Sequence, residues 1–368
     1  MNTHAPQKLH GLDHLRALAI LLVFLSHFMI LTGRNPAWML DLADFGWTGV
    51  DLFFVLSGFL ISGQLFEQVQ QNQAIRFKPF FLKRFFRIMP AFWVTLLIYF
   101  CFPFFREKES LPPLWKFLSF TQNLGLDLRY NRTFSHAWSL CVEEHFYLLL
   151  PLVLIFLQKF RLIKNAYWLL ALLFLLGFIT RVYSFNHFYL PLSETEFSWP
   201  HWYKYVYYPT YNRLDGLLIG VGIAAIYHFR PAFRNRVLQY PYLFLVTGLA
   251  LLTAAFFLTE EQMSFSASVF GFPLVSLGYG CLVVAALSPA GFLYRRRSAL
   301  TATIATLSYS IYLTHKGIIH LTKQAASNWN LDSNLLLVMC MLTCTGFAFL
   351  LYRLVERPFM QLRKRLVN

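Results

Sequence analysis

Residues 15–32 read LRALAILLVFLSHFMILT. A helix needs roughly 17–25 mostly apolar residues to cross the hydrocarbon core of a bilayer, and this stretch meets that length with two ionisable side chains, Arg16 and His27. No small-residue cleavage site follows it, and the chain runs on into Arg34 and further apolar sequence. We therefore expect a retained transmembrane helix and not a secretory signal peptide that is removed.

The same composition continues along the whole chain. Of its 368 residues, 57% are hydrophobic and 13% are charged, whereas a soluble domain carries about 25% charged residues. The chain is therefore predicted to be an all-α membrane protein with about ten transmembrane helices in a single domain, residues 1–368. The expected spans are 15–32, 47–66, 88–105, 143–158, 165–182, 212–229, 240–258, 268–287, 303–322 and 333–352.

The basic residues indicate how the helices are oriented. A formal net charge of +15 would suit a nucleic-acid-binding protein, but in so apolar a chain basic loop residues are better explained as topology determinants and lipid-headgroup contacts. If the N-terminus is cytoplasmic, most of the 32 Lys and Arg residues fall on cytoplasmic loops, and the alternation holds at every crossing. We expect both termini to be cytoplasmic, and we expect no nucleic-acid partner.

The cysteines carry no sign of special chemistry. All five lie scattered through apolar segments, where a thiol behaves as a small hydrophobic group. Neither they nor the His, Asp and Glu residues follow the spacing of metal ligands. We therefore expect no metal and no disulfide framework.

Ionisable residues inside the predicted spans or at their ends form two groups. Such residues are costly in a membrane and suggest a functional site by default. One group is expected near the outer face: His27, Asp51, Glu143, Glu144, Arg213, Asp215 and His315. The other is expected near the inner face: Arg16, Arg84, Arg87, the triple Arg at 295–297, Glu356 and Arg357.

Each of these residues also has a purely structural interpretation. A single histidine in an apolar helix is more often a hydrogen-bonded packing residue than a catalyst, and Arg84 and Arg87 alone are more simply topology determinants. Arg213 with Asp215 could form a structural ion pair. Because neighbouring residues lie about 100° apart on a helix, only one of Glu143 and Glu144 is expected to face a site, and we prefer Glu143.

Several motifs in this chain occur together in one known family. They are GLDHLRALAILLVFLSHF (11–28), GVDLFFVLSGFLISG (49–63), FLKRFFRIMPAFW (81–93), HAWSLCVEEHFYLLLP (136–151), YNRLDGLLIG (211–220), SYSIYLTH (308–315) and ERPF (356–359). In this order and over nearly the whole chain, the sequence resembles the acyltransferase-3 family of bacterial integral-membrane O-acyltransferases. It departs from the family pattern at Cys141, His145 and Lys316. Because the chain ends soon after Arg357, we expect the form without an appended hydrolase-like domain.

The resemblance implies a reaction. Family members are thought to take an acyl group, commonly acetyl, from cytoplasmic acyl-CoA and to place it on a hydroxyl of a carbohydrate or lipid-linked glycan beyond the membrane. This makes acyl-CoA a co-substrate with no permanently bound cofactor, and it places the chain in the bacterial inner membrane as a multi-pass protein.

The resemblance also suggests roles for individual residues. His27 would act as general base, with Asp51 or Glu143 fixing its tautomer, because a neutral imidazole suits proton transfer at physiological pH. An acyl-histidine intermediate is a less favoured variant. Guanidinium groups bind phosphate bidentately, so the acyl-CoA would be held by Arg16, Arg84 and Arg87. The residues expected on the acceptor side or in support are Glu144, Arg213, Asp215, Tyr309 and His315.

Two other classes of protein share part of this pattern. A secondary transporter also has about ten helices and buried charges, but it should show two related halves, which this sequence lacks. An assembly subunit for polysaccharide export would not need both polar groups. Within the enzyme class, acceptor choice is expected to depend on the outer loops 105–137 and 183–211, since variable loops on a rigid scaffold carry specificity.

Overall fold

The computed structural model describes residues 9–71 and 73–367, and within these ranges the chain is helical and has no β-strand. Both chain ends, whose side of the membrane we predicted, lie outside the described residues. The long helices are α1 (His10–Thr32), α3 (Gly49–Gln70), α4 (Phe77–Cys101), α6 (Trp138–Lys159), α7 (Ala166–Ser184), α9 (Asp215–Phe229), α11 (Pro241–Leu258), α12 (Phe272–Leu287), α14 (Ala299–Ala325) and α15 (Ser333–Leu351).

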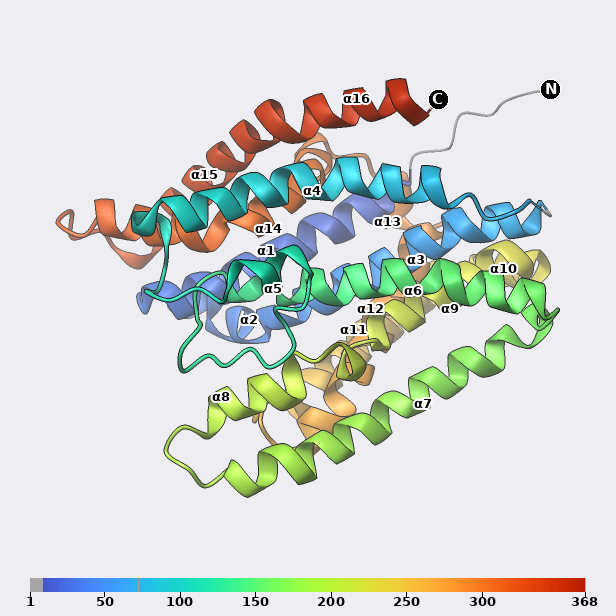
Figure 1. Ribbon diagram of the computed structural model, residues 1–368, viewed down its shortest axis with the longest axis horizontal. Coiled ribbons are helices and arrows are strands. Elements are labelled where there is room, and N and C mark those ends of the chain that lie inside the picture. Colours follow the sequence, from blue (N-terminus) through green and yellow to red (C-terminus); the bar gives the residue numbers. More distant parts are fainter. Residues whose placement is uncertain (1–8, 72, 368) are drawn as a thin grey trace.

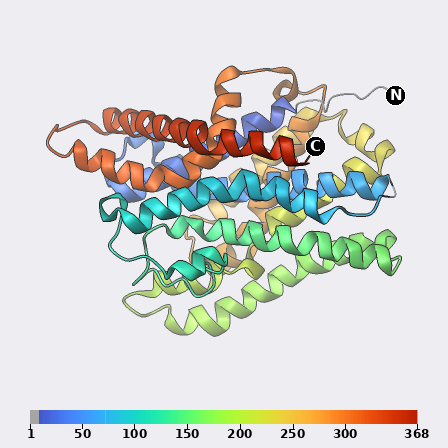
Figure 2. The same ribbon diagram turned by 45° about the horizontal axis from the view of Figure 1, so that its top comes forward.

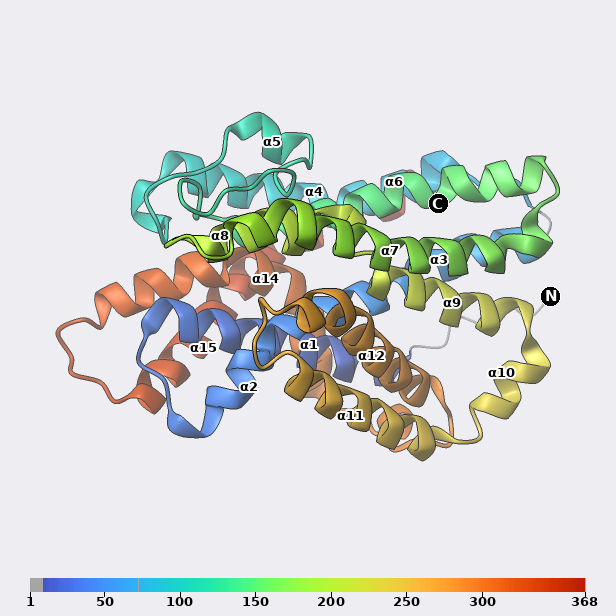
Figure 3. The ribbon, with the colours of Figure 1, turned by 90° about the horizontal axis from the view of Figure 1, so that it is seen from below.

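Shorter helices connect the long ones. They are α2 (Leu40–Asp44), α5 (Leu114–Leu118), α8 (Ser198–Trp202), α10 (Pro231–Val237), α13 (Phe292–Arg295) and α16 (Arg357–Val367). The long helices run roughly along the longest axis of the molecule (Figure 1). After a 45° turn of the view, α15 and α16 lie in front, beside α4 (Figure 2). Seen from below, α6 and α7 lie along one side, α11 and α12 along the opposite side, and α1 and α3 between them (Figure 3).

The helices differ in how much of their apolar surface the protein itself covers. Between Ala37 and Gln70, 72% of the apolar window is buried, whereas α7 and α11 bury only 17% of theirs. In water such exposed apolar helices would be unstable, but in lipid their side chains are already in an apolar solvent. The core of the bundle is therefore formed by α1, α3 and α14, and α7 and α11 are peripheral.

Small residues allow α3 and α9 to approach closely. A Cβ atom added at Gly58 would lie 2.2 Å from the carbonyl oxygen of Leu217, and one added at Gly220 would lie 2.3 Å from that of Val55. Glycine is thus required at both positions, as is common where membrane helices pack through their backbones. This contact fixes the relative positions of Asp51 on α3 and the start of α9.

The predicted class of fold is confirmed. Among the described residues, eight helices are long and apolar enough to cross a membrane, or nine if α9 and α10, which are bent by 114°, form one broken span. The predicted span 303–322 is also helical, within α14, but its many polar residues make it less apolar than the others.

Four helices (α1, α4, α6 and α14) begin earlier than the apolar runs indicated, and two of these differences affect the predicted site. α4 begins at Phe77 and not at residue 88, and α6 begins at Trp138 and not at residue 143. A charged residue interrupts an apolar run in the sequence, but it need not interrupt the helix. A long side chain can place its charge in water or in a polar cavity while its backbone stays helical. Glu143 therefore lies about 7 Å inside α6, rather than at its outer end.

Candidate active site

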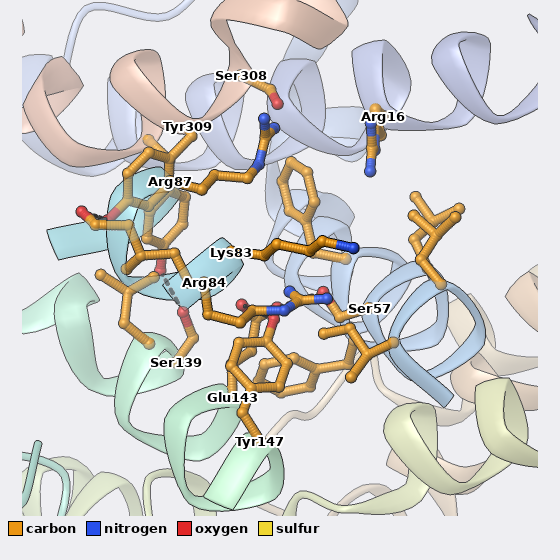
Figure 4. A pocket seen from close by; sticks show the side chains of 18 of the residues that line it. Arg16, Ser57, Lys83, Arg84, Arg87, Ser139, Glu143, Tyr147, Ser308 and Tyr309 are labelled. Carbon is orange, nitrogen blue, oxygen red and sulfur yellow. Dashed lines mark hydrogen bonds between the residues drawn. The ribbon is translucent and has the colours of Figure 1, made fainter. Parts of the chain in front are cut away.

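A cavity of about 450 Å³ opens among α1, α3, α4, α6 and α14. We call it the arginine cavity. Its polar lining consists of Arg16, Ser57, Gln64, Lys83, Arg84, Arg87, Ser139, Glu143, Tyr147, Ser308, Tyr309, Tyr312 and Arg363. Figure 4 shows Arg16 on one side of this space and Glu143 with Tyr147 on the other, while Lys83 and Arg84 reach between them. Three of the predicted site residues, Arg16, Arg84 and Arg87, thus meet in one place.

The cations of this cavity have few partners within the protein. Lys83, Arg84 and Arg87 form no ion pair in the described part of the chain. The guanidinium of Arg84 lies 4.6 Å from the ring centroid of Tyr147, and that of Arg87 contacts the sulfur of Met360 at 3.8 Å. Lys83 is exposed and Arg84 and Arg87 are half-buried, so an incoming anion can reach these cations and pair with them.

The carboxylate of Glu143 faces the arginine cavity. Its two oxygens accept hydrogen bonds from the Ser57 hydroxyl at 2.8 Å and the Tyr147 hydroxyl at 2.9 Å. Glu144 is not among the lining residues, so the helix turns the first glutamate of the pair inward. The sequence had placed Glu143 beside His27 near the outer face. The structure places it deeper, with the arginines, because α6 begins before it.

The end of the cavity away from the arginines is closed by Tyr312. Its hydroxyl lies 2.6 Å from the Ser139 hydroxyl and donates to the His136 carbonyl at 2.5 Å. Tyr309, which we expected on the acceptor side, instead lines the arginine cavity and donates to the carbonyl of Ile88 at 2.9 Å.

Three imidazoles meet directly beyond Tyr312. They belong to His27 on α1, to His136 in the short turn η4 (Ser135–Ala137) and to His315 on α14. Their ring centroids are 4.8 Å apart for His27 and His315, 4.9 Å for His136 and His315, and 5.9 Å for His27 and His136. We call this group the histidine cluster. Among the described residues, no group of His, Cys, Asp or Glu side chains has the arrangement of a metal site.

The hydrogen bonds of the cluster determine its neutral tautomers. The Nδ1 atom of His315 lies 2.8 Å and 3.1 Å from the carbonyl oxygens of Tyr312 and Ile311, which can only accept, so Nδ1 carries the proton. Its Nε2 is therefore an acceptor, and it lies 3.0 Å from Nδ1 of His27. That Nδ1 is also 3.0 Å from the Val23 carbonyl and must be the donor. The Nε2 atom of His27 is left with its lone pair.

A buried ammonium group lies beside the histidine cluster. Lys316, next to His315 on α14, has its Nζ 3.0 Å from the Ser135 hydroxyl and 3.0 Å from a carboxylate oxygen of Glu107. The same oxygen of Glu107 accepts the backbone N–H of Phe134 at 3.0 Å. The pair ties α14 to the loop before α6, so it holds both His315 and His136 in place.

The remaining predicted residues belong to a separate pair of buried contacts. The sequence suggested an ion pair between Arg213 and Asp215, but in the structure each of these two residues pairs with a residue of another helix. Arg213 binds Asp51 at 2.8 Å, and Asp215 binds Arg181 at 2.6 Å, with all four side chains at most 3% exposed. Asp51 is therefore held by an arginine, and the structure joins neither Asp51 nor Glu143 to His27.

Sequence reasoning passed over two residues of this region, His136 and Tyr312. His136 is the first residue of a motif, but it lay in a stretch predicted to be loop, and Tyr312 lies in the motif 308–315 without a predicted role. Neither ring nitrogen of His136 has a well-aligned hydrogen-bond partner, although the residue is 3% exposed. The sequence did carry a signal for His136. No helix-breaking residue lies between His136 and the paired glutamates, so the helix could begin well before Glu143.

The fold and the site define a polytopic helical membrane protein. Its arginine cavity is lined by cations and ends next to the histidine cluster. The sequence pattern of the family described as an acyltransferase domain matches residues 9–353, and the chain belongs to this family, acyltransferase-3. The match covers the histidine cluster and every lining residue of the arginine cavity except Arg363, and it confirms the resemblance drawn from the motifs.

Several characterised or named relatives share this domain. The peptidoglycan O-acetyltransferase OatA of Listeria monocytogenes is 31% identical over 85% of this chain and 49% of that protein. A putative O-acetyltransferase of Staphylococcus aureus is 27% identical over 95% of this chain and 57% of that protein, and the O-acetyltransferase OatA of the same species is 25% identical over 96% and 58%. The chain thus spans about half the length of the curated relatives it matches. No solved structure matches the chain.

Proposed function

We propose that this protein transfers an acyl group, acetyl in the first instance, from acyl-CoA to a hydroxyl of a carbohydrate. One observation carries the proposal. The arginine cavity has unpaired cations at one end and closes at the other end against Tyr312, whose ring centroid is 5.4 Å from that of His136 and 6.0 Å from that of His315. An anionic donor bound in this cavity would lie in line with a proton-accepting site.

The cations suit the donor. Coenzyme A carries phosphate groups at one end of a long, narrow pantetheine arm and its thioester at the other. Arg16 and His27 are eleven residues apart on α1, or roughly 16 Å along the helix axis, so one extended molecule can contact both regions. Arg16, Arg84 and Arg87 would hold the phosphates, with Lys83 beside them, and this end of the bundle would be the cytoplasmic one.

The histidine cluster suits the chemical step. In this scheme Nε2 of His27 removes the proton from the acceptor hydroxyl as its oxygen attacks the thioester carbonyl. A C–O bond forms, the C–S bond breaks, and the departing thiolate takes the proton from the imidazolium. His315 accepts the hydrogen bond of His27 Nδ1 and so keeps Nε2 available, which is the role we had assigned to a carboxylate.

The relatives support the class of acceptor. One of them is named for peptidoglycan and the others for O-acetyl transfer, so a carbohydrate acceptor is the natural proposal for this chain. The acceptor would approach from the end of the bundle opposite the arginines. With the arginine end cytoplasmic, the protein would lie in the bacterial inner membrane and act on a cell-surface or exported glycan.

The proposal can be tested with the purified, detergent-solubilised protein. We expect release of free CoA from acetyl-CoA in the presence of glycan acceptors, and a loss of about 10²–10⁴-fold in the His27→Ala variant, which removes the base. His228→Ala is a matched control, because this histidine lies near the end of α9 and outside both the cavity and the cluster.

The outcomes separate the rival classes. An acyltransferase forms acylated product without other proteins, whereas a transporter or an assembly subunit for polysaccharide export does not. Full transfer by a folded His27→Ala variant would remove His27 from the chemistry. Absence of CoA release by the folded wild-type protein over a panel of acceptors would favour the transporter or the assembly subunit.

A further inference from the structure

A second cavity, of about 660 Å³, lies at the opposite end of the bundle from the arginine cavity. We call it the loop pocket, because most of it is formed by the loop that follows α4. Its lining residues are Pro103, Arg106, Glu107, Lys108, Glu109, Ser110, Arg129, Tyr130, Arg132 and His320. Its volume falls in the range of small-molecule sites, about 300–1,000 Å³. Nothing described above assigns it a ligand.

One cation of the loop pocket is already neutralised. Arg129 binds Asp127 through two contacts, at 2.9 Å and 2.5 Å, and Lys204 approaches the same carboxylate at 3.5 Å. The hydrogen bonds from Arg129 lower the pKa of Asp127 to about 2, so this carboxylate stays charged at physiological pH. The net charge that the pocket offers to a ligand therefore depends on its other basic residues, which outnumber its one exposed carboxylate, Glu109.

Three basic residues of the loop pocket lack an acidic partner in the described part of the chain: Arg106, Lys108 and Arg132. Arg106 donates to the carbonyl oxygens of Tyr99 and Phe100 at the end of α4, at 2.7 Å and 2.9 Å. These bonds hold its guanidinium in place without neutralising it. Within the described residues the ammonium group of Lys108 forms no ion pair, and the side chain is exposed.

Glu107 forms the inner wall of the pocket, and its charge is neutralised by Lys316, which lies on the side of the histidine cluster. The Glu107 side chain is 1% exposed and binds Lys316 at 3.0 Å. Lys316 in turn contacts Ser135, which precedes His136 in the chain. A single ion pair therefore separates the loop pocket from the histidine cluster, and the pocket is the region of the opposite face that lies next to the proposed base.

The pocket also offers aromatic surface. Tyr130 lines it and is 66% exposed, and the guanidinium of Arg132 lies 5.0 Å from the ring centroid of Trp199. An aromatic ring with an apolar face and a polar edge suits a sugar, whose ring has the same two kinds of surface. Cations without a carboxylate partner beside the exposed ring of Tyr130 suit a ligand that is both carbohydrate and anionic.

We infer that the loop pocket is the acceptor subsite and that it selects a glycan bearing carboxylate or phosphate groups. The inference rests on the proposed function only in naming the pocket as the acceptor side of that reaction. Lys108 and Arg132 attract the anionic groups, Tyr130 contacts a sugar ring, and the Glu107–Lys316 pair marks the wall through which the hydroxyl approaches His27.

Direct binding tests this inference independently of catalysis. The probes are tetragalacturonate and its fully methyl-esterified form, which has the same sugars without the charges. Each is titrated calorimetrically into the purified full-length protein in neutral detergent, without acetyl-CoA. We expect the charged form to bind at least about tenfold more tightly, and we expect added salt to reduce the difference because the site is exposed.

Charge reversal locates the site. Lys108→Glu should weaken binding of tetragalacturonate about tenfold and leave binding of the ester unchanged. The matched control is Lys116→Glu, which alters the charge of the same loop by the same amount outside the pocket. Equal effects of both variants would show attraction by the whole loop and would overturn the inference.

Two further outcomes are decisive. Equal affinity for the charged and the esterified tetrasaccharide would overturn the proposed selection. Binding of phosphatidylglycerol nanodiscs that depends on Lys108, with no binding of either tetrasaccharide, would show a lipid-headgroup site and would also overturn it. Charge-dependent glycan binding by a protein that transfers no acyl group would support the pocket and contradict only the proposed reaction.

Discussion

The arginine cavity and the buried ion pairs of α3, α7 and α9 both bring arginines into the helical bundle, but in different surroundings. Arg181 and Arg213 are 1% exposed or less, and each has a carboxylate within 2.8 Å. Arg84 and Arg87 also project into the bundle, but no carboxylate pairs with either in the described residues. Arg181 and Arg213 are thus neutralised by carboxylates of the protein itself. In our proposal, Arg84 and Arg87 are neutralised by a ligand.

This difference distinguishes structural charges from functional ones. An ion pair that is fully satisfied between helices holds those helices in register, and it offers nothing to an incoming molecule. Arg213 further illustrates this, since its guanidinium is surrounded by the rings of Trp138, Tyr207 and Phe272 at 4.1–5.2 Å. The cations around the cavity of about 450 Å³ outnumber its one carboxylate, Glu143, and they therefore retain a net attraction for an anion.

The largest effect is expected from breaking a satisfied pair. Asp51→Ala leaves the Arg213 charge buried without a partner, and we expect a loss of about 3–5 kcal/mol in the free energy of unfolding. Thermal and denaturant unfolding of the purified protein in detergent measures it. The double variant Asp51→Leu with Arg213→Leu should recover much of the loss. Full stability of Asp51→Ala alone would contradict a structural role for the pair.

A smaller effect, of a different kind, is expected from removing an unpaired cation. Arg84→Gln should raise the KM for acetyl-CoA roughly tenfold to a hundredfold, because a charge-assisted hydrogen bond contributes about 1.5–3 kcal/mol. Stability should not fall. The control is Arg234→Gln, since Arg234 lies on α10 outside the cavity. An unchanged KM accompanied by reduced stability would place Arg84 with the structural arginines.

The histidine cluster allows a test of positioning. His315→Ala removes the acceptor for His27 Nδ1, and we expect the kcat of acetyl transfer to fall about tenfold with the KM for acetyl-CoA unchanged. His315→Gln should restore part of the rate, because its amide oxygen can accept the same hydrogen bond. If the two variants behave alike, or if only KM changes, His315 does not orient the base.

The smallest effect is expected from an exposed pair. Arg129 lowers the pKa of Asp127 to about 2 from 3.8, so the pair stabilises the protein fully above about pH 4 and loses that contribution as the pH falls through 2. Because the pair is partly exposed, Asp127→Asn should cost less than about 1 kcal/mol at pH 7. Unfolding as a function of pH measures it, and the difference from wild type should vanish near pH 2. A loss as large as that of Asp51→Ala would contradict the distinction between exposed and buried pairs.

Much of this fold could be predicted from the sequence. The apolar runs locate the long helices because a backbone in lipid must satisfy its hydrogen bonds within each segment. The errors occurred where charges lie inside helices, as with Lys83 and Arg84 in α4. A hydropathy pattern treats such residues as loop, whereas the structure carries them into a polar cavity. The depth of Glu143 was misjudged for the same reason.

The sequence by itself determined the class of protein, the helices, and the placing of Arg16 and His27 about 16 Å apart on one helix. Only the tertiary structure decided which charged residues are partners. It pairs Asp51 with Arg213 and His27 with His315, and it leaves Arg84 unpaired. The physical reason is that these helices are apolar on nearly every side, so the sequence does not show which side of each helix faces its neighbour. Partner choice depends on the rotation and register of whole helices, which packing of the complete bundle sets.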